Sequence, residues 1–325
     1  MTHPTQAQRA ARRQALAMMG AAVLAGALPA TLARAATATR EVRIGFQKYG
    51  TLTLLKGRGT LEPRLAEKGI TVKWTEFPAG PVLLEGLNVG SIDFGTVGEA
   101  PPIFAQAAGA NLVYVGHEPP SPASEAIVVP KGSPLRTLAD LRGKKVALNK
   151  GSNVHYLLVK ALEKAGIAYA DIQPVFLPPA DARAAFERGA VDAWAIWDPF
   201  LAAAEHQLGA RVLADGSGLV ANHQFYLAAR PYAEKNADIV AIVLEEVAKV
   251  DDWGRQHLAE VAAILARQTG LEPAVLELAA KRYSYGVKPV SAAVIAEQQK
   301  IADTFLNLKL IPAAIVVKHA QLAAR

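Results

Sequence analysis

Two glycine-containing segments of this chain combine residue types that suit the binding of a small anion. Residues 151–153 read Gly-Ser-Asn and come directly before leucines and valines at helical spacing, which predicts a helix start capped by Ser152 or Asn153. Unpaired amides and the helix dipole favour negative charge at such a start. Residues 98–101, Gly-Glu-Ala-Pro, predict a second helix start that faces the first. The pair indicates an anion site, although capping without a ligand explains Ser152 and Asn153 equally well.

Aromatic side chains at the ends of predicted strands supply apolar walls beside that site. The candidates are Phe46, Phe77 and the two tryptophans within residues 193–197. Side chains alternate between the two faces of a strand, so Trp194 and Trp197 must point to opposite sides. Because Trp197 is nearer the carboxyl end of the strand, we assign Trp197 to the cleft and Trp194 to the core.

Cysteine and several common enzyme motifs are missing from the sequence. The chain has no cysteine, which removes thiol catalysis, disulfides and thiolate metal sites. It has no Gly-x-Ser-x-Gly elbow and no phosphate-binding loop, and residues 216–218 lack the third glycine of a dinucleotide fingerprint. The seven histidines are scattered, without a pair at metal-ligand spacing. The sequence therefore predicts a binding protein that needs no cofactor and no metal, and not an enzyme.

The excess positive charge is concentrated near the start of the chain. The net charge of +6 includes four arginines within residues 1–35, a stretch without any acid, so the remainder carries about +2 and has no basic stripe for a nucleic acid. Paired arginines at 12–13, an apolar stretch at 15–32 and Ala-Arg-Ala at 33–35 are the parts of an export signal. We predict a signal peptide at 1–35, of the twin-arginine type, and a soluble periplasmic protein after cleavage. An uncleaved membrane anchor is the alternative.

The chain nearly repeats itself at a distance of about 100 residues. Residues 72–95 and 172–194 each predict a strand, a proline-containing turn, a helix closed by glycine, and a strand that begins Gly-x-Ile/Val-Asp. Strands that alternate with helices predict a mainly parallel sheet in each copy. The predicted fold class is therefore α/β, with two lobes and a ligand cleft between them.

Two positions in each copy have a structural explanation. Gly90 and Gly189 are expected to end a helix in the left-handed conformation, which glycine adopts without steric cost. Asp93 and Asp192 are expected to be buried acids that bind backbone amides rather than catalysts.

The chain is expected to cross twice between the lobes. The β-rich residues 125–129 lead into Pro130 and predict the first crossing, and residues 225–228 predict the return strand to the first lobe. The predicted lobes are residues 36–128 with 228–325, and residues 129–227. A helix is also expected around residues 54–68, and the segment after residue 312 is expected to be a loose tail.

Several phrases of the sequence, in order along both predicted lobes, match one family. They include Glu-Phe-Pro-Ala-Gly-Pro at 76–81, Gly-Glu-Ala-Pro-Pro at 98–102, Val-Asp-Ala-Trp at 191–194 and Ile-Trp-Asp-Pro at 196–199. From residue 42 to about 312 the chain resembles the periplasmic aliphatic sulfonate-binding proteins of ABC transporters. The resemblance implies a type II periplasmic-binding-protein fold, with two crossing strands and lobes that close on the ligand. It also implies a monomer that delivers an alkanesulfonate to an inner-membrane ABC permease and its ATPase for sulfur acquisition.

The resemblance and the strand-end segments together predict one ligand site. Its candidate residues are Gln47, Phe77, Gly80, Glu99, Ala100, Gly151, Ser152, Asn153, Val154, His155, Trp197 and Asp198. Amides of residues 151–154 and near Ala100, with the side chains of Ser152, Asn153 and Gln47, are expected to hold the three sulfonate oxygens. Phe77, Gly80 and Trp197 are expected to border the carbon tail.

Two carboxylates among these candidates, Glu99 and Asp198, are unfavourable beside an anion. Three roles are open to them: locking the lobes, accepting backbone amides, or facing an amine on the ligand. Taurine, nitrate and a thiamine-precursor pyrimidine are alternative ligands for the same fold. The wider superfamily also contains a desulfinase, but its cysteine nucleophile has no counterpart in this chain. A sensor domain that acts through a separate protein is a further alternative.

Overall fold

The computed structural model describes residues 40–322 of the 325-residue chain. These residues belong to one compact unit, Thr39–Arg325. The predicted signal peptide at 1–35 lies outside the described residues. Within residues 40–322, no helix has both the length and the apolar character needed to span a membrane.

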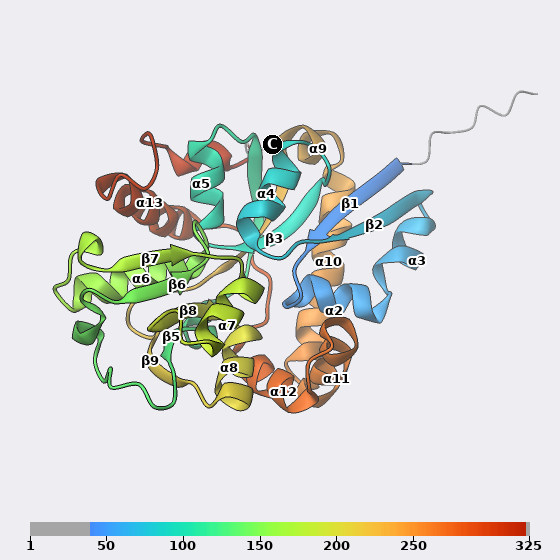
Figure 1. The fold of residues 1–325 in the computed structure, drawn as a ribbon. Coiled ribbons are helices and arrows are strands. Elements are labelled where there is room, and N and C mark those ends of the chain that lie inside the picture. The colour runs from blue at the N-terminus through green and yellow to red at the C-terminus, as the bar shows by residue number, and fades with distance from the viewer. Residues whose placement is uncertain (1–39, 323–325) are drawn as a thin grey trace, which may run out of the picture. The chain divides into compact units, whose positions relative to one another are not determined.

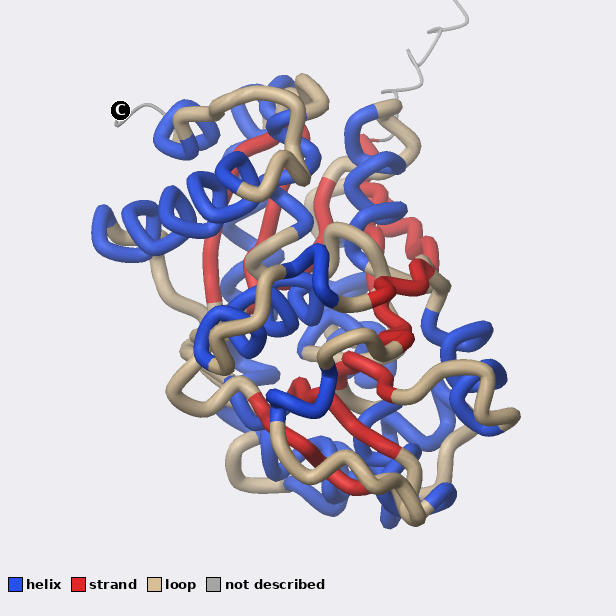
Figure 2. The backbone as a smooth tube through the Cα atoms, turned by 60° about the vertical axis from the view of Figure 1, so that its left-hand side comes forward, coloured by secondary structure: helices blue, strands red, loops and turns tan. Residues whose placement is uncertain are grey.

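The strands of the described part form two separate five-stranded sheets, one in each lobe (Figures 1 and 2). The first sheet contains β1 (Arg40–Phe46), β2 (Ile70–Glu76), β3 (Phe94–Gly98), β4 (Leu112–His117) and β10 (Gln224–Ala229), in the order β2-β1-β3-β10-β4. The second contains β5 (Glu125–Val129), β6 (Lys145–Leu148), β7 (Gln173–Phe176), β8 (Ala193–Trp197) and β9 (Arg211–Asp215), in the order β7-β6-β8-β5-β9. In these described sheets β10 runs antiparallel to β3 and β4, β5 runs antiparallel to β8 and β9, and the other pairings are parallel. The predicted α/β fold with two mainly parallel sheets is confirmed.

Helices cover both faces of the sheets (Figure 1). The first lobe has α2 (Thr51–Arg58), α3 (Leu61–Ala66), α4 (Gly80–Asn88), α5 (Pro101–Ala107), α9 (Arg230–Lys235), α10 (Ala237–Gly254), α11 (Leu258–Thr269), α12 (Pro273–Arg282) and α13 (Ala292–Asn307). The second lobe has α6 (Asn153–Lys164), α7 (Pro179–Glu187) and α8 (Phe200–Leu208). Along β10, Tyr226 and Ala228 pack with α10, whereas Phe225 and Leu227 pack with α4 and α5. Burial on both faces explains why such strands are continuous apolar runs in the sequence.

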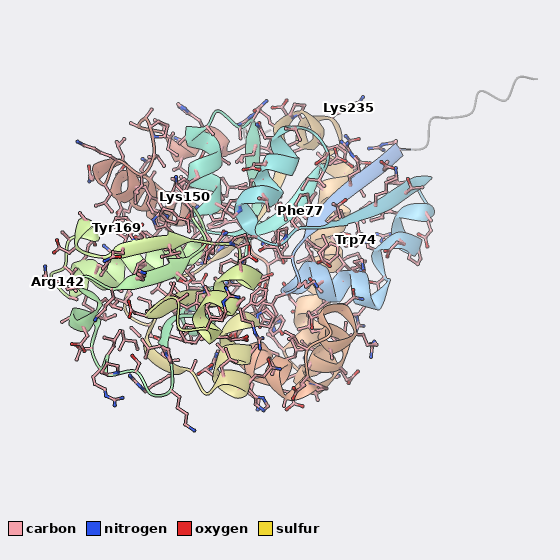
Figure 3. All side chains as sticks on the ribbon, viewed as in Figure 1. Trp74, Phe77, Arg142, Lys150, Tyr169 and Lys235 are labelled. Carbon is pink, nitrogen blue, oxygen red and sulfur yellow. The ribbon has the colours of Figure 1, made fainter. Side chains whose placement is uncertain are left out.

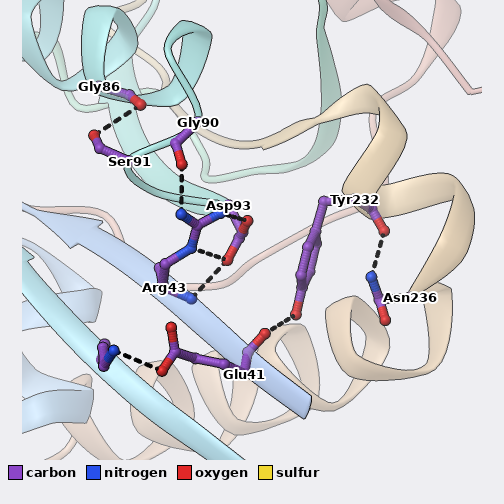
Figure 4. Close-up of polar contacts among 9 residues, drawn as sticks. Glu41, Arg43, Gly86, Gly90, Ser91, Asp93, Tyr232 and Asn236 are labelled. Atoms are coloured by element: carbon purple, nitrogen blue, oxygen red, sulfur yellow. Dashed lines mark hydrogen bonds and ion pairs between the residues drawn. The ribbon is translucent and has the colours of Figure 1, made fainter. Parts of the chain in front are cut away.

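The internal repeat is visible in the way each lobe fixes an aspartate. Asp93 accepts hydrogen bonds from the backbone N of Arg43 (2.9 Å) and from its guanidinium (2.9 and 2.5 Å), and its own N donates to the Arg43 carbonyl at 2.7 Å (Figure 4). Asp192 accepts from Lys145 N at 2.8 Å and donates from its own N to the Lys145 carbonyl at 2.9 Å. Both acids therefore tie two neighbouring strands together, which confirms the predicted binding of backbone amides. The predicted burial is confirmed for Asp93, whereas Asp192 is half-buried.

The glycines that precede these acids also behave as expected. Gly90 and Gly189 have φ angles of 72° and 67°, in the left-handed region. A Cβ added at either position would meet nothing within 4 Å. The backbone conformation at the helix end, rather than crowding, is therefore the reason for glycine here.

Two predicted elements differ from the structure. The helix expected around residues 54–68 is divided into α2 and α3, because Gly59, with a φ of 63°, ends α2 in the left-handed conformation. The segment after residue 312 is not a loose tail as far as it is described. Val317 and Ala320, on a short 3-10 turn, are buried against the core that α13 shares with the first sheet.

The chain crosses between the sheets at residues 118–124 and 216–223. These two segments lie side by side, since the backbone N of Ser121 donates to the Ala221 carbonyl at 3.1 Å. Residues 125–129, expected as the first crossing, are instead β5, which pairs on both sides with strands of the second sheet. The apolar run that suggested a crossing is explained by burial inside that sheet.

The return strand was placed correctly, because residues 225–228 lie within β10 of the first sheet. The predicted lobe boundaries, at 128/129 and 227/228, remain a prediction. Sheet membership favours moving both of them several residues toward the N-terminus, because β5 and β10 each pair within a single sheet.

Candidate functional site

A small polar cavity of about 60 Å³ lies between the lobes. Six of the predicted candidates line it: Gln47, Gly80, Ser152, Asn153, Trp197 and Asp198. Gln47 directly follows β1, Trp197 is the last residue of β8, and Ser152 precedes α6. The carboxyl ends of parallel strands, and the helix starts that follow them, are where α/β sheets bind ligands. The two sheets therefore bring these side chains together from opposite sides.

The cavity offers neutral hydrogen-bond donors and no cation. Gln47 Nε2 donates to the Thr96 carbonyl at 3.2 Å and keeps its second N–H. Trp197 and Gln224 also line the cavity, and the N–H groups of their side chains make no hydrogen bond within the described residues. Among residues 40–322, no Lys, Arg or His side chain contributes to the lining. An anion would therefore be held by N–H and O–H groups rather than by an ion pair.

The Asn153 side chain joins the two lobes at the wall of this cavity. Its Oδ1 accepts from the backbone N of Ala100 at 3.3 Å, and its Nδ2 donates to Asn222 Oδ1. Asn222, on the second crossing, in turn donates to Ser124 Oγ at 3.0 Å. Gly98 is tightly matched to this arrangement, because any Cβ there would overlap the Asn153 amide. These hydrogen bonds therefore connect the first lobe, the start of α6 in the second lobe and the second crossing segment.

The start of α6 is built differently from the prediction of a side-chain cap. Ser152 is the N-cap residue, but its Oγ donates to the Asn149 carbonyl at 2.7 Å and caps no helix amide. Asn153 is the first helical residue, and its side chain is engaged with Ala100 and Asn222. The amides of this helix start are thus left without a side-chain cap, as an anion site requires.

A second, larger cavity of about 310 Å³ adjoins the polar one and shares Gln47, Tyr49 and Trp197 with it. Most of its remaining walls are apolar and include Phe77, Pro178, Pro179, Phe200 and Leu271. Figure 3 shows Phe77 at the junction of the two lobes. Trp197 borders both cavities, whereas Trp194 is 1% exposed in the core of the second lobe. A ligand with a polar head and an apolar tail matches this pair of cavities.

Asp198 places a buried carboxyl group on the polar cavity. Its side chain is 0% exposed, Oδ1 accepts from Ala202 N at 2.9 Å, and Oδ2 has no hydrogen-bond partner among the described residues. Arg282 of the first lobe lies 3.5 Å from Oδ1 but is closer, at 2.5 Å, to Glu205 of the second lobe. Burial raises the pKa of Asp198 to about 7, against the opposing effect of Arg282. The group therefore combines a lobe-to-lobe contact with a free oxygen at the cavity.

Glu99 does not reach the polar cavity. It is 2% exposed, its Oε2 accepts from the backbone N of His223 at 3.1 Å, and it borders a different cavity that Tyr156 and Glu297 also line. Burial raises the pKa of Glu99 to about 7. Of the three roles considered for this residue, the structure shows the acceptance of a backbone amide.

Four other candidates, Ala100, Gly151, Val154 and His155, are buried behind the cavity rather than in its lining. The N–H of Ala100 is already bonded to Asn153, and Val154 belongs to the core of the second lobe. His155 is 0% exposed, accepts from Gly151 N at 3.2 Å through Nδ1, and lies 2.8 Å from the Tyr169 hydroxyl through Nε2. Burial lowers the pKa of His155 to about 4. These residues support the start of α6.

The structure adds cavity residues that sequence reasoning did not select. Tyr49 and Tyr283 both line the polar cavity, with ring centroids 5.3 Å apart in an edge-on contact. Thr96, Gln224 and Asn222 also line it, and the remaining lining residues are Gly50, Gly98, Pro101 and Ser124. Gln224 and Asn222 lie next to the predicted return strand, so their place in the sequence pointed to the boundary between the lobes. Tyr283 follows α12, and no sequence pattern indicated that it reaches the cavity.

Comparison with known proteins gives a consistent result. Residues 65–256 match the family described as NMT1/THI5 like. A protein of Escherichia coli K12, named as an aliphatic sulfonates-binding protein, is 50% identical over 300 residues that cover 91% of this chain and 93% of the relative.

Two solved structures are also similar over nearly the whole described chain. The alkanesulfonate-binding protein SsuA of Xanthomonas axonopodis pv. citri, bound to MOPS, has a TM-score of 0.84 and 45% identity over 87% of this chain and 98% of that one. The periplasmic aliphatic sulphonate binding protein SsuA of Escherichia coli has a TM-score of 0.78 and 48% identity over 88% and 94%. On identity, coverage and fold together, this chain belongs to the NMT1/THI5-like family, among the aliphatic sulfonate-binding proteins.

Proposed function

We propose that this protein captures an alkanesulfonate between its lobes and hands it to an ABC permease with its ATPase in the inner membrane. The observation that carries the proposal is the joined pair of cavities, one polar and free of cationic side chains, the other walled mainly by apolar groups. The sulfonate head would occupy the first and the carbon tail the second. A periplasmic location, a monomeric state and the absence of catalysis are parts of the same proposal.

The head would be held by neutral donors. A sulfonate is ionised at any physiological pH, so it accepts hydrogen bonds and needs no proton transfer. Gln47, Trp197 and Gln224 line the cavity and carry side-chain N–H groups without a partner, and the start of α6 adds the backbone amide of Asn153 and the helix dipole. An oxygen that loses water without gaining a donor costs about 1–3 kcal/mol, so several donors are needed together. The candidates that lie outside the lining are not included in this proposed contact set.

The tail would be selected by the apolar cavity. Each methylene buried from water contributes about 0.8 kcal/mol, which is roughly a fourfold gain in affinity. Taurine would place an ammonium group among mainly apolar walls, where the carboxylate of Glu76 is already paired with Lys48 at 3.6 Å, and would gain less. Nitrate would leave the 310 Å³ cavity without an occupant. The geometry therefore favours sulfonates with a carbon chain over these two alternatives.

The test is calorimetric titration of residues 36–325 with methane-, butane- and octanesulfonate, taurine, nitrate and sulfate. We expect affinity to rise with chain length, and Leu271→Ala, in the wall of the apolar cavity, to weaken octanesulfonate more than methanesulfonate. Leu308→Ala is the matched control, because Leu308 is 36% exposed and lines neither cavity. Binding of nitrate, but of no sulfonate, would refute the proposal.

A further inference from the structure

Asp198 is the one carboxyl group in the lining of the polar cavity, within the part of the chain that the structure describes. Its Oδ2 is buried and has no hydrogen-bond donor, while Oδ1 is committed to Ala202 N at 2.9 Å. A sulfonate oxygen and an ionised carboxylate oxygen are both acceptors and cannot hydrogen-bond to each other. Because Asp198 belongs to the lining and Oδ2 has no donor, an ionised Asp198 would conflict with the proposed ligand unless a proton lies between them.

The nearby cation does not remove this conflict. Arg282 NH2 lies 2.5 Å from Glu205 Oε2, whereas its NH1 is 3.5 Å from Asp198 Oδ1, on the side of the carboxyl away from the free oxygen. The positive charge of Arg282 is thus matched first by Glu205. With Asp198 neutral, the three groups together carry no net charge, and nothing repels an anion in the cavity.

We propose, on the basis of the proposed function, that Asp198 binds the sulfonate as the neutral acid and donates a hydrogen bond to it from Oδ2. Ligand capture then takes up a proton, and the ionised form of Asp198 opposes capture. Asp198 is therefore a specificity-determining residue. As a neutral acid it can donate a hydrogen bond to a sulfonate, which carries no proton of its own and can only accept.

The other ionisable groups around Asp198 do not offer a different source for the proton. Tyr49, after β1, and Tyr283, after α12, line the same cavity, and burial raises the pKa of each well above its usual value. Glu205 on α8 is paired with Arg282 on α12. Glu125 on β5 lies opposite Trp197 in the strand register, outside the lining, and burial holds its pKa well above its usual value. Glu99, whose pKa burial also raises to about 7, borders a different cavity. Among the groups that line the polar cavity, Asp198, with its pKa raised to about 7, is therefore the one that changes charge near neutrality.

The expected pH dependence follows from the population of the acid form. If only that form binds, the apparent dissociation constant rises in proportion to the loss of the acid form. For a pKa of about 7, the acid fraction falls from about one half at pH 7 to about one hundredth at pH 9. Affinity for butanesulfonate should therefore fall about 50-fold over this range.

The experiment is titration of butanesulfonate into the protein at pH 6, 7, 8 and 9, in two buffers that have no sulfonate group and differ in ionisation enthalpy. We expect butanesulfonate affinity to fall about 50-fold between pH 7 and pH 9. We also expect the binding enthalpy to differ between the two buffers, because proton uptake by the protein releases a proton from the buffer. Asp198→Asn keeps an acceptor for Ala202 N and a donor for the cavity, so it should bind at every pH with about the affinity of the wild type at pH 6. Asp192→Asn, in the same lobe but outside the lining, is the control and should keep the wild-type pH dependence.

Four results would overturn the inference. Wild-type affinity that is constant from pH 6 to 9, without proton uptake, shows that no acid donor is involved. A large loss of butanesulfonate affinity in Asp198→Asn at every pH shows that the carboxylate itself is needed. Preference for taurine over butanesulfonate that disappears in Asp198→Asn shows that Asp198 accepts from an amine. Failure of every variant and the wild type to bind any sulfonate overturns the proposed function as well.

Discussion

The contact between Gly98 and Asn153 offers a direct test of how the lobes hold a ligand. Gly98 ends β3 in the first lobe, and a Cβ at this position would overlap the Asn153 amide at the start of α6 in the second lobe. In Gly98→Ala the Asn153 side chain must move, because the alternative is to move a sheet strand. That movement breaks its bonds to Ala100 N and Asn222 Oδ1.

The size of the effect follows from those two hydrogen bonds. Ala100 is 0% exposed, so its N–H would be left unpaired in a buried position. Leaving a buried polar group unpaired costs about 1–3 kcal/mol, so two lost bonds give roughly 2–6 kcal/mol against the closed form. We therefore expect the dissociation constant for butanesulfonate to rise by at least about 30-fold. The core of each lobe is untouched, so the melting temperature without ligand should change little.

Calorimetric titration measures the affinity, and a thermal melt without ligand measures the stability. Gly132→Ala is the matched control, because an added Cβ at Gly132 meets nothing within 4 Å. It should bind butanesulfonate as the wild type does. Wild-type affinity in Gly98→Ala would refute the reasoning, since it would show that the Asn153 bridge is not part of the ligand-holding form.

Two further predictions concern stability. Asp93→Asn should lower the free energy of unfolding by about 1–3 kcal/mol in urea titrations, because Asp93 ties Arg43 of β1 to the start of β3. It should leave sulfonate affinity unchanged, because Asp93 is not part of the cavity lining. Asp238→Asn, in an exposed ion pair with Arg40, should lower the free energy of unfolding by less than about 1 kcal/mol. Equal losses in both variants would contradict this. His155 has its pKa lowered to about 4 by burial, below the usual 6.5, so its contribution to stability is present above pH 6.5 and is lost as pH falls toward 4. Between pH 7 and pH 5 the wild type should lose about 2 kcal/mol more than His155→Gln in urea titrations, and parallel pH profiles would contradict the assignment.

Sequence reasoning located the cavity through strand ends and helix starts. Gln47, Ser152 and Trp197 follow or precede elements whose apolar patterns are clear, and parallel sheets bring such positions to one edge. The break between α2 and α3 was readable in principle, because Gly59 is a helix-ending residue within the expected helix.

Other positions required the tertiary structure. His155 and Val154 are next to cavity residues in the sequence, but the turn of α6 directs them into the core. Tyr283 reaches the cavity only because α12 packs beside the second lobe, a contact that no local pattern encodes. The direction of a side chain at a helix start, and long-range docking of helices, are decided by packing rather than by spacing along the chain.

The sheet order has a consequence for how this chain folds as it is made. The second lobe is a contiguous insertion, and its sheet is complete once β9 ends at Asp215. The first sheet must wait for β10. Leu227 of β10 pairs with Gly95 of β3, and the whole second lobe lies between these two residues in the sequence. Such distant pairing carries a loop-closure cost that slows folding. On a chain that emerges N-terminus first, the inserted lobe can therefore reach its native form while β3 and β4 still lack the strand that lies between them. Assembly of the first lobe is then the late step of biogenesis.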